Sequence, residues 1–164
     1  MHKLLLTATV LSSSMVMAEP VYLYRAYSSK ATDHFYTASL DELLNAVNGS
    51  YVYEGAAGKC MPSQEPDTVP LYRMWGGGRL GDHFYTISWQ ERDLAIANGT
   101  YAYEGVACYV YAQQNAGTCP LYRLTNGTDH FYTQSWQEVL SASRGMRYEG
   151  VAAYLYPAGP ACPD

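Results

Sequence analysis

Aspartate and histidine recur together in a pentapeptide, DHFYT, that the chain spells three times. The copies occupy residues 33–37, 82–86 and 129–133. A carboxylate beside an imidazole suits acid–base chemistry, and three equivalent imidazoles on one axis would suit a zinc ion. Neighbouring side chains on a strand point to opposite faces, so Asp33 and His34 are not expected to form a dyad within one copy. Nothing in the spacing calls for an ion, and we expect neither a metal nor another cofactor.

Other catalytic signatures are weak in this sequence. It has no Gly-x-Ser-x-Gly nucleophile elbow. Its four cysteines are expected to be paired, which removes a thiolate nucleophile. A carboxylate pair for glycoside hydrolysis is an open alternative. However, a catalytic site draws different roles from different elements, and here every candidate occurs in triplicate. We therefore expect a protein that is not an enzyme, with an extracellular hydrolase as an alternative.

Each pentapeptide lies in a longer unit that repeats about every 50 residues. The segments LYR and HFYT are short and aromatic, which predicts strands. A serine followed three residues later by a glutamate predicts a capped helix start at positions 39, 88 and 135. These helices are expected to end near Asn48, Asn98 and Arg144. The YEG segment that follows predicts a further strand or hairpin, with its glycine at a bulge or turn.

The repeats determine the expected fold. The first, second and third units cover about residues 19–66, 67–115 and 116–160. One such unit cannot bury both of its faces, whereas three together can share a core. We predict a single domain over residues 19–164, of α+β class and mainly β. Its three strand-strand-helix-strand repeats would form a compact pseudo-threefold structure, either trefoil-like or like a small propeller.

The N-terminus and the overall charge limit the classes of partner. Residues 1–18 contain a short basic start, an apolar run and a small-residue end, which is typical of a cleaved secretory signal peptide. The formal net charge is −5, so neither nucleic acid nor an anionic membrane surface is an expected partner. We predict a secreted protein, extracellular or periplasmic. The sequence leaves its oligomeric state open.

The cysteines are even in number, which in an exported chain predicts two disulfides. They are Cys60, Cys108, Cys119 and Cys162. Three pairings exist, and the preferred one joins Cys108 to Cys119 across a short loop and Cys60 to Cys162 near the C-terminus. The alternatives remain open at this level.

The segments PLYR, DHFYT and YEGVAAYLY, at this spacing, resemble a family of secreted repeats of unknown function. Such repeats occur in bacterial and fungal extracellular proteins, often appended to hydrolases or peptidases. The resemblance covers nearly all of the chain after residue 18. The first unit departs from it, with VYLYR in place of PLYR and Leu40 in place of tryptophan. The resemblance implies attachment to glycans or cell walls and supplies no catalytic residues.

Strand alternation predicts two different faces for the pentapeptide. Its Asp and Phe would face the core, and a buried carboxylate there needs a partner such as an arginine guanidinium. We therefore predict a structural clasp of charged residues in each unit. The three clasps comprise Arg25, Asp33 and Glu54; Arg73, Asp82 and Glu104; and Arg123, Asp129 and Glu149.

The His and Tyr of each pentapeptide share the opposite face, where we expect any ligand to bind. Aromatic rings beside polar groups make good platforms for sugars, and two further aromatic residues lie near the most variable loops. The candidate ligand-binding residues are His34, Tyr36, His83, Tyr85, His130, Tyr132, Tyr27 and Trp75. We predict a recognition module that binds carbohydrate or cell-wall glycan. The alternative is a structural or protein-interaction module without glycan binding.

Overall fold

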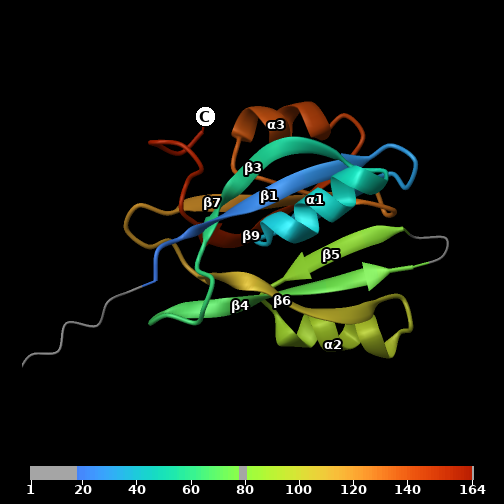
Figure 1. The fold of residues 1–164 in the computed structure, drawn as a ribbon. Helices are drawn as coiled ribbons and strands as arrows, with labels where there is room; N and C mark the ends of the chain where they lie inside the picture. Colours follow the sequence, from blue (N-terminus) through green and yellow to red (C-terminus); the bar gives the residue numbers. More distant parts are fainter. Residues whose placement is uncertain (1–17, 78–80, 164) are drawn as a thin grey trace, which may run out of the picture.

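The computed structural model describes residues 18–77 and 81–163, and it is mainly β (Figure 1). Each unit contributes two strands, a helix and a third strand, in the predicted order. The elements are β1 Val21–Ser28, β2 Asp33–Thr37, α1 Leu40–Gly49, β3 Val52–Cys60, β4 Thr68–Gly76, β5 Asp82–Thr86, α2 Trp89–Ala97, β6 Ala102–Tyr111, β7 Cys119–Thr125, β8 His130–Thr133, α3 Trp136–Ala142 and β9 Arg147–Leu155.

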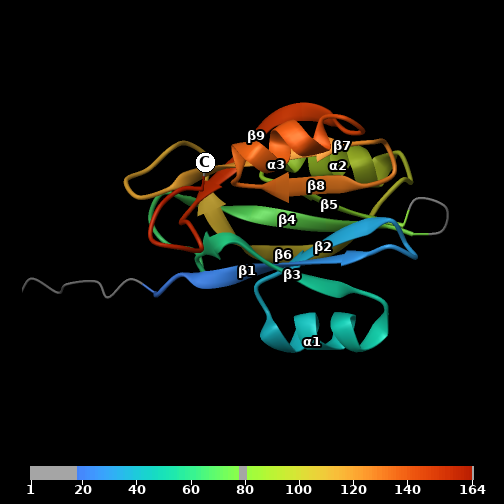
Figure 2. The same ribbon diagram turned by 90° about the horizontal axis from the view of Figure 1, so that it is seen from above.

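The strands form two antiparallel sheets, with a curled, half-barrel arrangement. One sheet has the order β2-β1-β3 and the other the order β5-β4-β6-β9-β7-β8. In every unit the LYR strand therefore lies between the pentapeptide strand and the YEG strand. Figures 1 and 2 show the three helices on the outside of the strands. The pentapeptide strands β2, β5 and β8 are sheet edges, and they face the interior.

Each YEG strand contains a β-bulge, the irregularity that its glycine predicted. In the first unit Arg25 is opposite Gly55 while the next residue, Ala26, is opposite Tyr53. Glu54 is therefore the extra residue of a β-bulge, which turns its side chain away from the regular alternation. Gly55 has a φ of 117°, a conformation that suits glycine. The second and third units have the same shift, at Glu104 and Glu149.

The helices begin where the sequence predicts. The hydroxyl oxygen of Ser39 accepts a hydrogen bond from the amide of Glu42, and the other two helices begin in the same way. The third helix ends at Ala142, two residues before the predicted end. The hydroxyl of Ser143 donates to the carbonyl oxygen of Val139 (2.7 Å), and such a local bond competes with a further helical turn.

The middle helix is attached differently from the other two. Leu43 in α1 and Val139 in α3 are buried, whereas the equivalent position in α2 is Arg92 and all nine residues of α2 are exposed or half-buried. The Arg92 guanidinium lies 4.4 Å from the ring centre of Tyr72 and 5.4 Å from that of Tyr103. A cation–π stack therefore replaces an apolar side chain as the contact between this helix and its sheet.

The ends of the YEG strands meet one another in pairs. Met61 is bridged to Tyr109, Tyr111 to Tyr154, and Tyr156 to Lys59. The six residues of these bridges occupy two equivalent positions in each unit, five and seven residues after the glutamate of YEG. The bridges thus join the first unit to the second, the second to the third, and the third to the first.

Two disulfides are present, as predicted, but the preferred pairing is wrong. Cys60 is bonded to Cys108, and Cys119 to Cys162. The bridge between Met61 and Tyr109 places the preceding cysteines side by side, with their Cα atoms 6.1 Å apart. The second disulfide attaches the segment that follows β9 to the start of β7.

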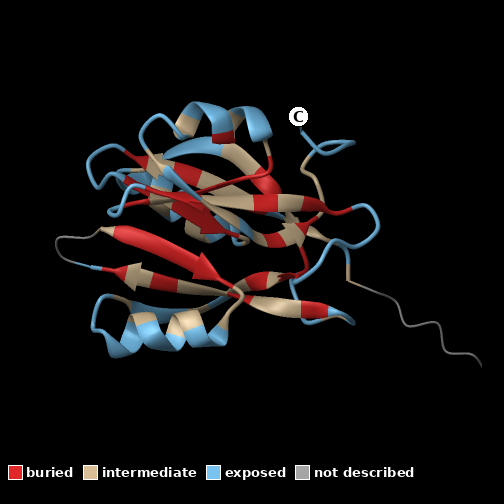
Figure 3. Ribbon diagram, turned by 180° about the vertical axis from the view of Figure 1, so that it is seen from behind, coloured by how far each residue is buried: buried red, intermediate tan, exposed pale blue. Residues whose placement is uncertain are grey.

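The core lies between the strands. Figure 3 shows β5 in red as a fully buried strand, and β2 and β8 are buried at all but one residue each. The core combines leucines from the LYR strands with aromatic rings from the pentapeptides, and its largest fully buried side chains include Tyr36, Tyr85 and Tyr132. Of the predicted signal peptide, residues 1–17 lie outside the described residues. Within the described part of the chain, no helix has the length and apolar character needed to cross a membrane.

Candidate functional site

The tyrosines of the three pentapeptides bind one another's strands. The hydroxyl of Tyr85 donates to the carbonyl oxygen of Tyr36 (2.7 Å) and accepts from its amide (2.8 Å). Tyr132 makes the same two bonds to Tyr85, and Tyr36 makes them to Tyr132. Burial raises the pKa of all three phenols well above its usual value. Each phenol therefore replaces the missing neighbour of an edge strand.

The histidines and aspartates of the pentapeptides are also paired between units. Nδ1 of His83 lies 2.7 Å from a carboxylate oxygen of Asp33, whose other oxygen accepts from the His83 amide. His130 pairs with Asp82 in this way, and His34 with Asp129. Strand alternation predicted no dyad within one copy, and it gave no partner in another copy. The partner aspartate lies 50 residues away in the sequence for His83, 48 for His130 and 95 for His34.

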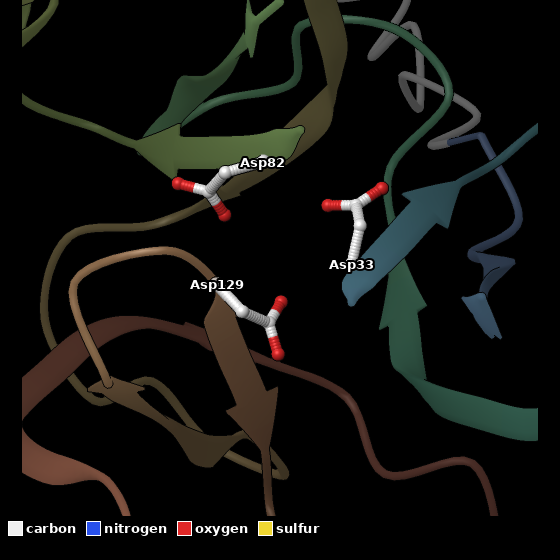
Figure 4. Close-up of side chains that lie close together, drawn as sticks. All are labelled: Asp33, Asp82 and Asp129. Atoms are coloured by element: carbon white, nitrogen blue, oxygen red, sulfur yellow. The ribbon is translucent and has the colours of Figure 1, made fainter. Parts of the chain in front are cut away.

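The three aspartates converge, as Figure 4 shows. One carboxylate oxygen from each of Asp33, Asp82 and Asp129 lies within 4.8 Å of the others, and all three residues are buried. Among the described residues this is the group whose geometry could hold a hard cation; the three histidines do not form such a group. The carboxylates also have internal donors, since Asp33 and Asp82 accept from Tyr51 and Tyr101 as well as from the histidines.

The predicted clasp contains the arginine and the glutamate of each unit. Arg25 is 3.0 Å from Glu54, Arg73 is 2.9 Å from Glu104, and Arg123 is 2.9 Å from Glu149. The aspartates, predicted as members of this clasp, bind the histidines instead. The bulge explains the difference, because it aims the glutamate at the guanidinium.

A second glutamate completes each clasp and was missed as a partner. Arg73 makes two hydrogen bonds to Glu42 (2.8 and 2.9 Å), the helix-start glutamate of the preceding unit. Arg123 binds Glu91 in the same way, and Arg25 binds Glu138. The threonine that ends each pentapeptide also donates to this glutamate. The sequence showed the glutamates only as capping residues.

The arginines and glutamates stabilise each other's charges. For Arg73, burial acts against the charged form, but the hydrogen bonds and charge of Glu42 outweigh it and raise the pKa. The hydrogen bonds from Arg73 in turn lower the pKa of the Glu42 carboxyl. Each arginine is thus held between two carboxylates, one from its own unit and one from the preceding unit.

A recess opens to solvent beside each of these ion pairs. We name the three after the helix whose start lines them. The α1 recess has a volume of about 440 Å³, the α2 recess about 220 Å³ and the α3 recess about 320 Å³. Equivalent residues line all three, namely Thr37, Ser39, Glu42, Arg73 and Val106; Thr86, Ser88, Glu91, Arg123 and Val151; and Thr133, Ser135, Glu138, Arg25 and Ala56.

None of the eight predicted ligand-binding residues lines any of these three recesses. Tyr36, Tyr85 and Tyr132 are each 1% exposed, and the ring of Tyr27 covers His34 at 4.5 Å. Trp75 covers His83 similarly, at 4.4 Å. The face assigned to a ligand is therefore interior, and the residues on it hold the units together. Part of the glycine-rich loop, residues 78–80, lies outside the described residues.

A family model described as "Domain of unknown function (DUF5648)" matches residues 22–156. This range covers all nine strands except the first residue of β1. No curated protein and no solved structure matches the chain.

Proposed function

Because the chain belongs to the DUF5648 family, whose function is unknown, we propose a role from the geometry of its recesses: it is a secreted, non-catalytic module that binds neutral carbohydrate. The observation that carries this proposal is the set of three recesses with equivalent linings. Repeated weak sites suit a polymeric glycan, because linked binding events raise the overall affinity without new contacts.

The arrangement behind the proposal is a pseudo-threefold ring of units. Its support is the cyclic pattern of contacts, in which phenol, imidazole and guanidinium groups each bind the neighbouring unit in the same sense. The bridges between the YEG strands follow the same cycle. Such a ring presents its three recesses at equivalent positions around the outside.

The chemistry of a recess favours hydroxyl groups over charged ligands. In the α1 recess the carboxylate of Glu42 is fixed by Arg73 and Thr37, so its position is set before a ligand arrives. Oriented carboxylate and hydroxyl oxygens can accept from, and donate to, the hydroxyls of a sugar. A second carboxylate, that of Glu104, balances Arg73 further, which disfavours anionic ligands.

Exposed aromatic rings lie on the outer face of each unit. In each, a tyrosine of the LYR strand contacts a tyrosine of the YEG strand, with ring centres 6.2 Å apart. The outer members, Tyr53, Tyr103 and Tyr148, are 47%, 45% and 39% exposed. Flat, amphipathic rings of this kind provide further surface for a sugar polymer.

Secretion is the remaining part of the proposal. Two disulfides form in the structure, and disulfides persist in oxidising compartments outside the cytosol. The signal-like segment at residues 1–18 is the sequence feature that agrees with export. Cell fractionation of the expressed full chain, with N-terminal sequencing of the exported form, tests this part independently of any ligand.

A glycan array tests the carbohydrate proposal. We expect the protein to bind neutral polysaccharides and not polyuronates or sulfated glycans. The double variant Val106→Trp with Val151→Trp fills two recesses and should reduce binding to a neutral polymer by about tenfold or more, through loss of avidity. Val52→Trp, at a 67% exposed strand position outside the recesses, is the matched control. Absence of binding to every neutral glycan at high density would contradict the proposal.

A further inference from the structure

The three recesses differ in one wall, and we propose that the α3 recess binds the acetamido group of an N-acetylated sugar while the other two bind sugar hydroxyls alone. The inference rests on the proposed carbohydrate function and names the ligand class of one of its sites. It follows from what the segment after β9 adds to this recess.

The added wall is apolar. Ala158, Gly159, Ala161 and Pro163 line the α3 recess together with Ala56 and Ala57 of β3. The α1 and α2 recesses have no equivalent of this segment among their described lining residues. A methyl group gains from contact with such a surface, whereas a hydroxyl there would lose its hydrogen bonds to water.

The first unit is adapted to this wall. Ala56 occupies the position of Val106 and Val151, so the β3 side of the recess is smaller by the two terminal methyl groups of valine. One position at which the first unit departs from the other two, Ala56, is therefore found where the added segment lies. The recess keeps a volume of about 320 Å³, which is within the usual range for a small-molecule site.

The wall is fixed at both ends. At one end the amide of Lys59 donates to the carbonyl oxygen of Tyr156 (2.7 Å), and the Tyr156 amide donates back to Lys59 (3.0 Å). At the other end Cys162 is bonded to Cys119, a fully buried residue of β7. Residues 157–161 thus span two anchors, and a wall held in this way is largely formed before the ligand binds.

The polar side of the recess matches the rest of an acetamido group. Glu138 is held by two hydrogen bonds from Arg25 (both 2.9 Å), and its side chain remains 41% exposed. A carboxylate oxygen of Glu138, which keeps lone pairs beyond those used by Arg25 and Thr133, accepts the amide N–H of the ligand. The methyl group then points to the alanines opposite.

Calorimetric titration with two trisaccharides tests the inference. Triacetylchitotriose and cellotriose differ in the acetamido or hydroxyl group at C2. In the Val106→Trp, Val151→Trp protein, which leaves the α3 recess open, we expect the acetylated sugar to bind about tenfold or more tightly than cellotriose, the usual effect of a well-placed apolar group. Equal affinity of this variant for the two sugars, or no binding of either, would overturn the inference.

Variants of the wall give the second test. Ala161→Asp places a carboxylate on the apolar wall and should remove the preference for the acetylated sugar. Thr100→Asp, at an exposed position outside the three recesses, should keep it. Cys119→Ser with Cys162→Ser releases the wall and should weaken the preference while the circular dichroism spectrum shows a folded protein. A preference that survives both wall variants contradicts the inference. If the unmodified protein binds neither sugar nor any glycan on the array, the proposed function itself fails.

Discussion

The hydroxyl of Tyr85 occupies both backbone hydrogen-bonding groups of Tyr36, donating to its carbonyl oxygen and accepting from its amide. The two residues belong to different units and lie on sheet edges that do not pair with each other. One side-chain oxygen thus makes the two hydrogen bonds that a neighbouring strand would otherwise make. The same arrangement occurs between the other two pairs of pentapeptide tyrosines.

Tyr85→Phe should therefore lower the free energy of unfolding by about 2–4 kcal/mol, because it leaves a buried amide and a buried carbonyl of Tyr36 without a partner. Chemical denaturation followed by circular dichroism measures the change. Tyr53→Phe is the control, since Tyr53 is 47% exposed, and it should stay within about 0.5 kcal/mol of the original. Equal effects of the two variants would show that the phenol bonds add no net stability.

Arg73→Met should lower the free energy of unfolding by about 1–3 kcal/mol. It leaves Glu42 and Glu104 without their shared cation, and the partial exposure of both carboxylates reduces the cost below that of a fully buried pair. Arg147→Met removes an arginine that is 74% exposed and should change little. Thermal unfolding of both variants at low and high salt makes the comparison; an unchanged Arg73→Met protein would mean that the clasp is free for a ligand.

Hydrogen exchange should identify α2 as the least protected helix. It has no counterpart of the buried Leu43 or Val139, and it is held to the sheet by the stack of Arg92 on Tyr72. Mass spectrometry of peptides from the three helices measures this directly. Arg92→Leu should slow exchange in α2 by restoring a buried apolar contact. Protection of α2 equal to that of α1 would contradict this account.

Acid should destabilise the protein below about pH 4.5. The pKa of the Glu42, Glu91, Glu138 and Asp82 carboxyls is lowered in the folded state. For the three glutamates, burial raises the pKa and the hydrogen bonds from arginine lower it, and the effect of the hydrogen bonds is the larger. For Asp82 the effect of burial is outweighed by His130.

The sign of this effect follows from proton linkage. A carboxyl whose folded-state pKa is lowered stabilises the fold above its unfolded value, about 3.9–4.3, and this contribution is lost as pH falls through the folded pKa. Unfolding free energies between pH 7 and pH 2 measure it. A free energy of unfolding that stays constant down to pH 2 would be inconsistent with the ion pairs described.

Local patterns in the sequence predicted the elements well. The Ser-x-x-Glu spacing located all three helix starts, and the glycines of YEG located the bulges. The contacts between units could not be predicted in this way. Strand alternation places the side chain of His83 on one face, but it cannot identify Asp33 as its partner. The three pentapeptides are identical, so the local sequence does not tell which unit's aspartate contacts which histidine. The same limit explains the incorrect disulfide pairing.

The candidate site was predicted less well than the fold. The alternation rule assigned Tyr36 to a ligand-binding face opposite the core. Its strand β2 is a sheet edge, but it lies against the pentapeptide strands of the other units and is therefore buried on both faces. One signal was available: the spacing Thr37, Ser39, Glu42 recurs in all three units. A capping box alone does not require the threonine, so its repetition indicates that the glutamate has a second partner.

The edge strands also constrain how the chain can fold. The edge of every pentapeptide strand that pairs with no other strand has its backbone groups hydrogen-bonded by a tyrosine of another unit. These bonds link the three units in a closed cycle. A nascent chain that has emerged only as far as its second unit therefore has no partner for one edge. Folding should accordingly be all-or-none over residues 19–164. Fragments that contain one or two units should aggregate and should not form small folded domains.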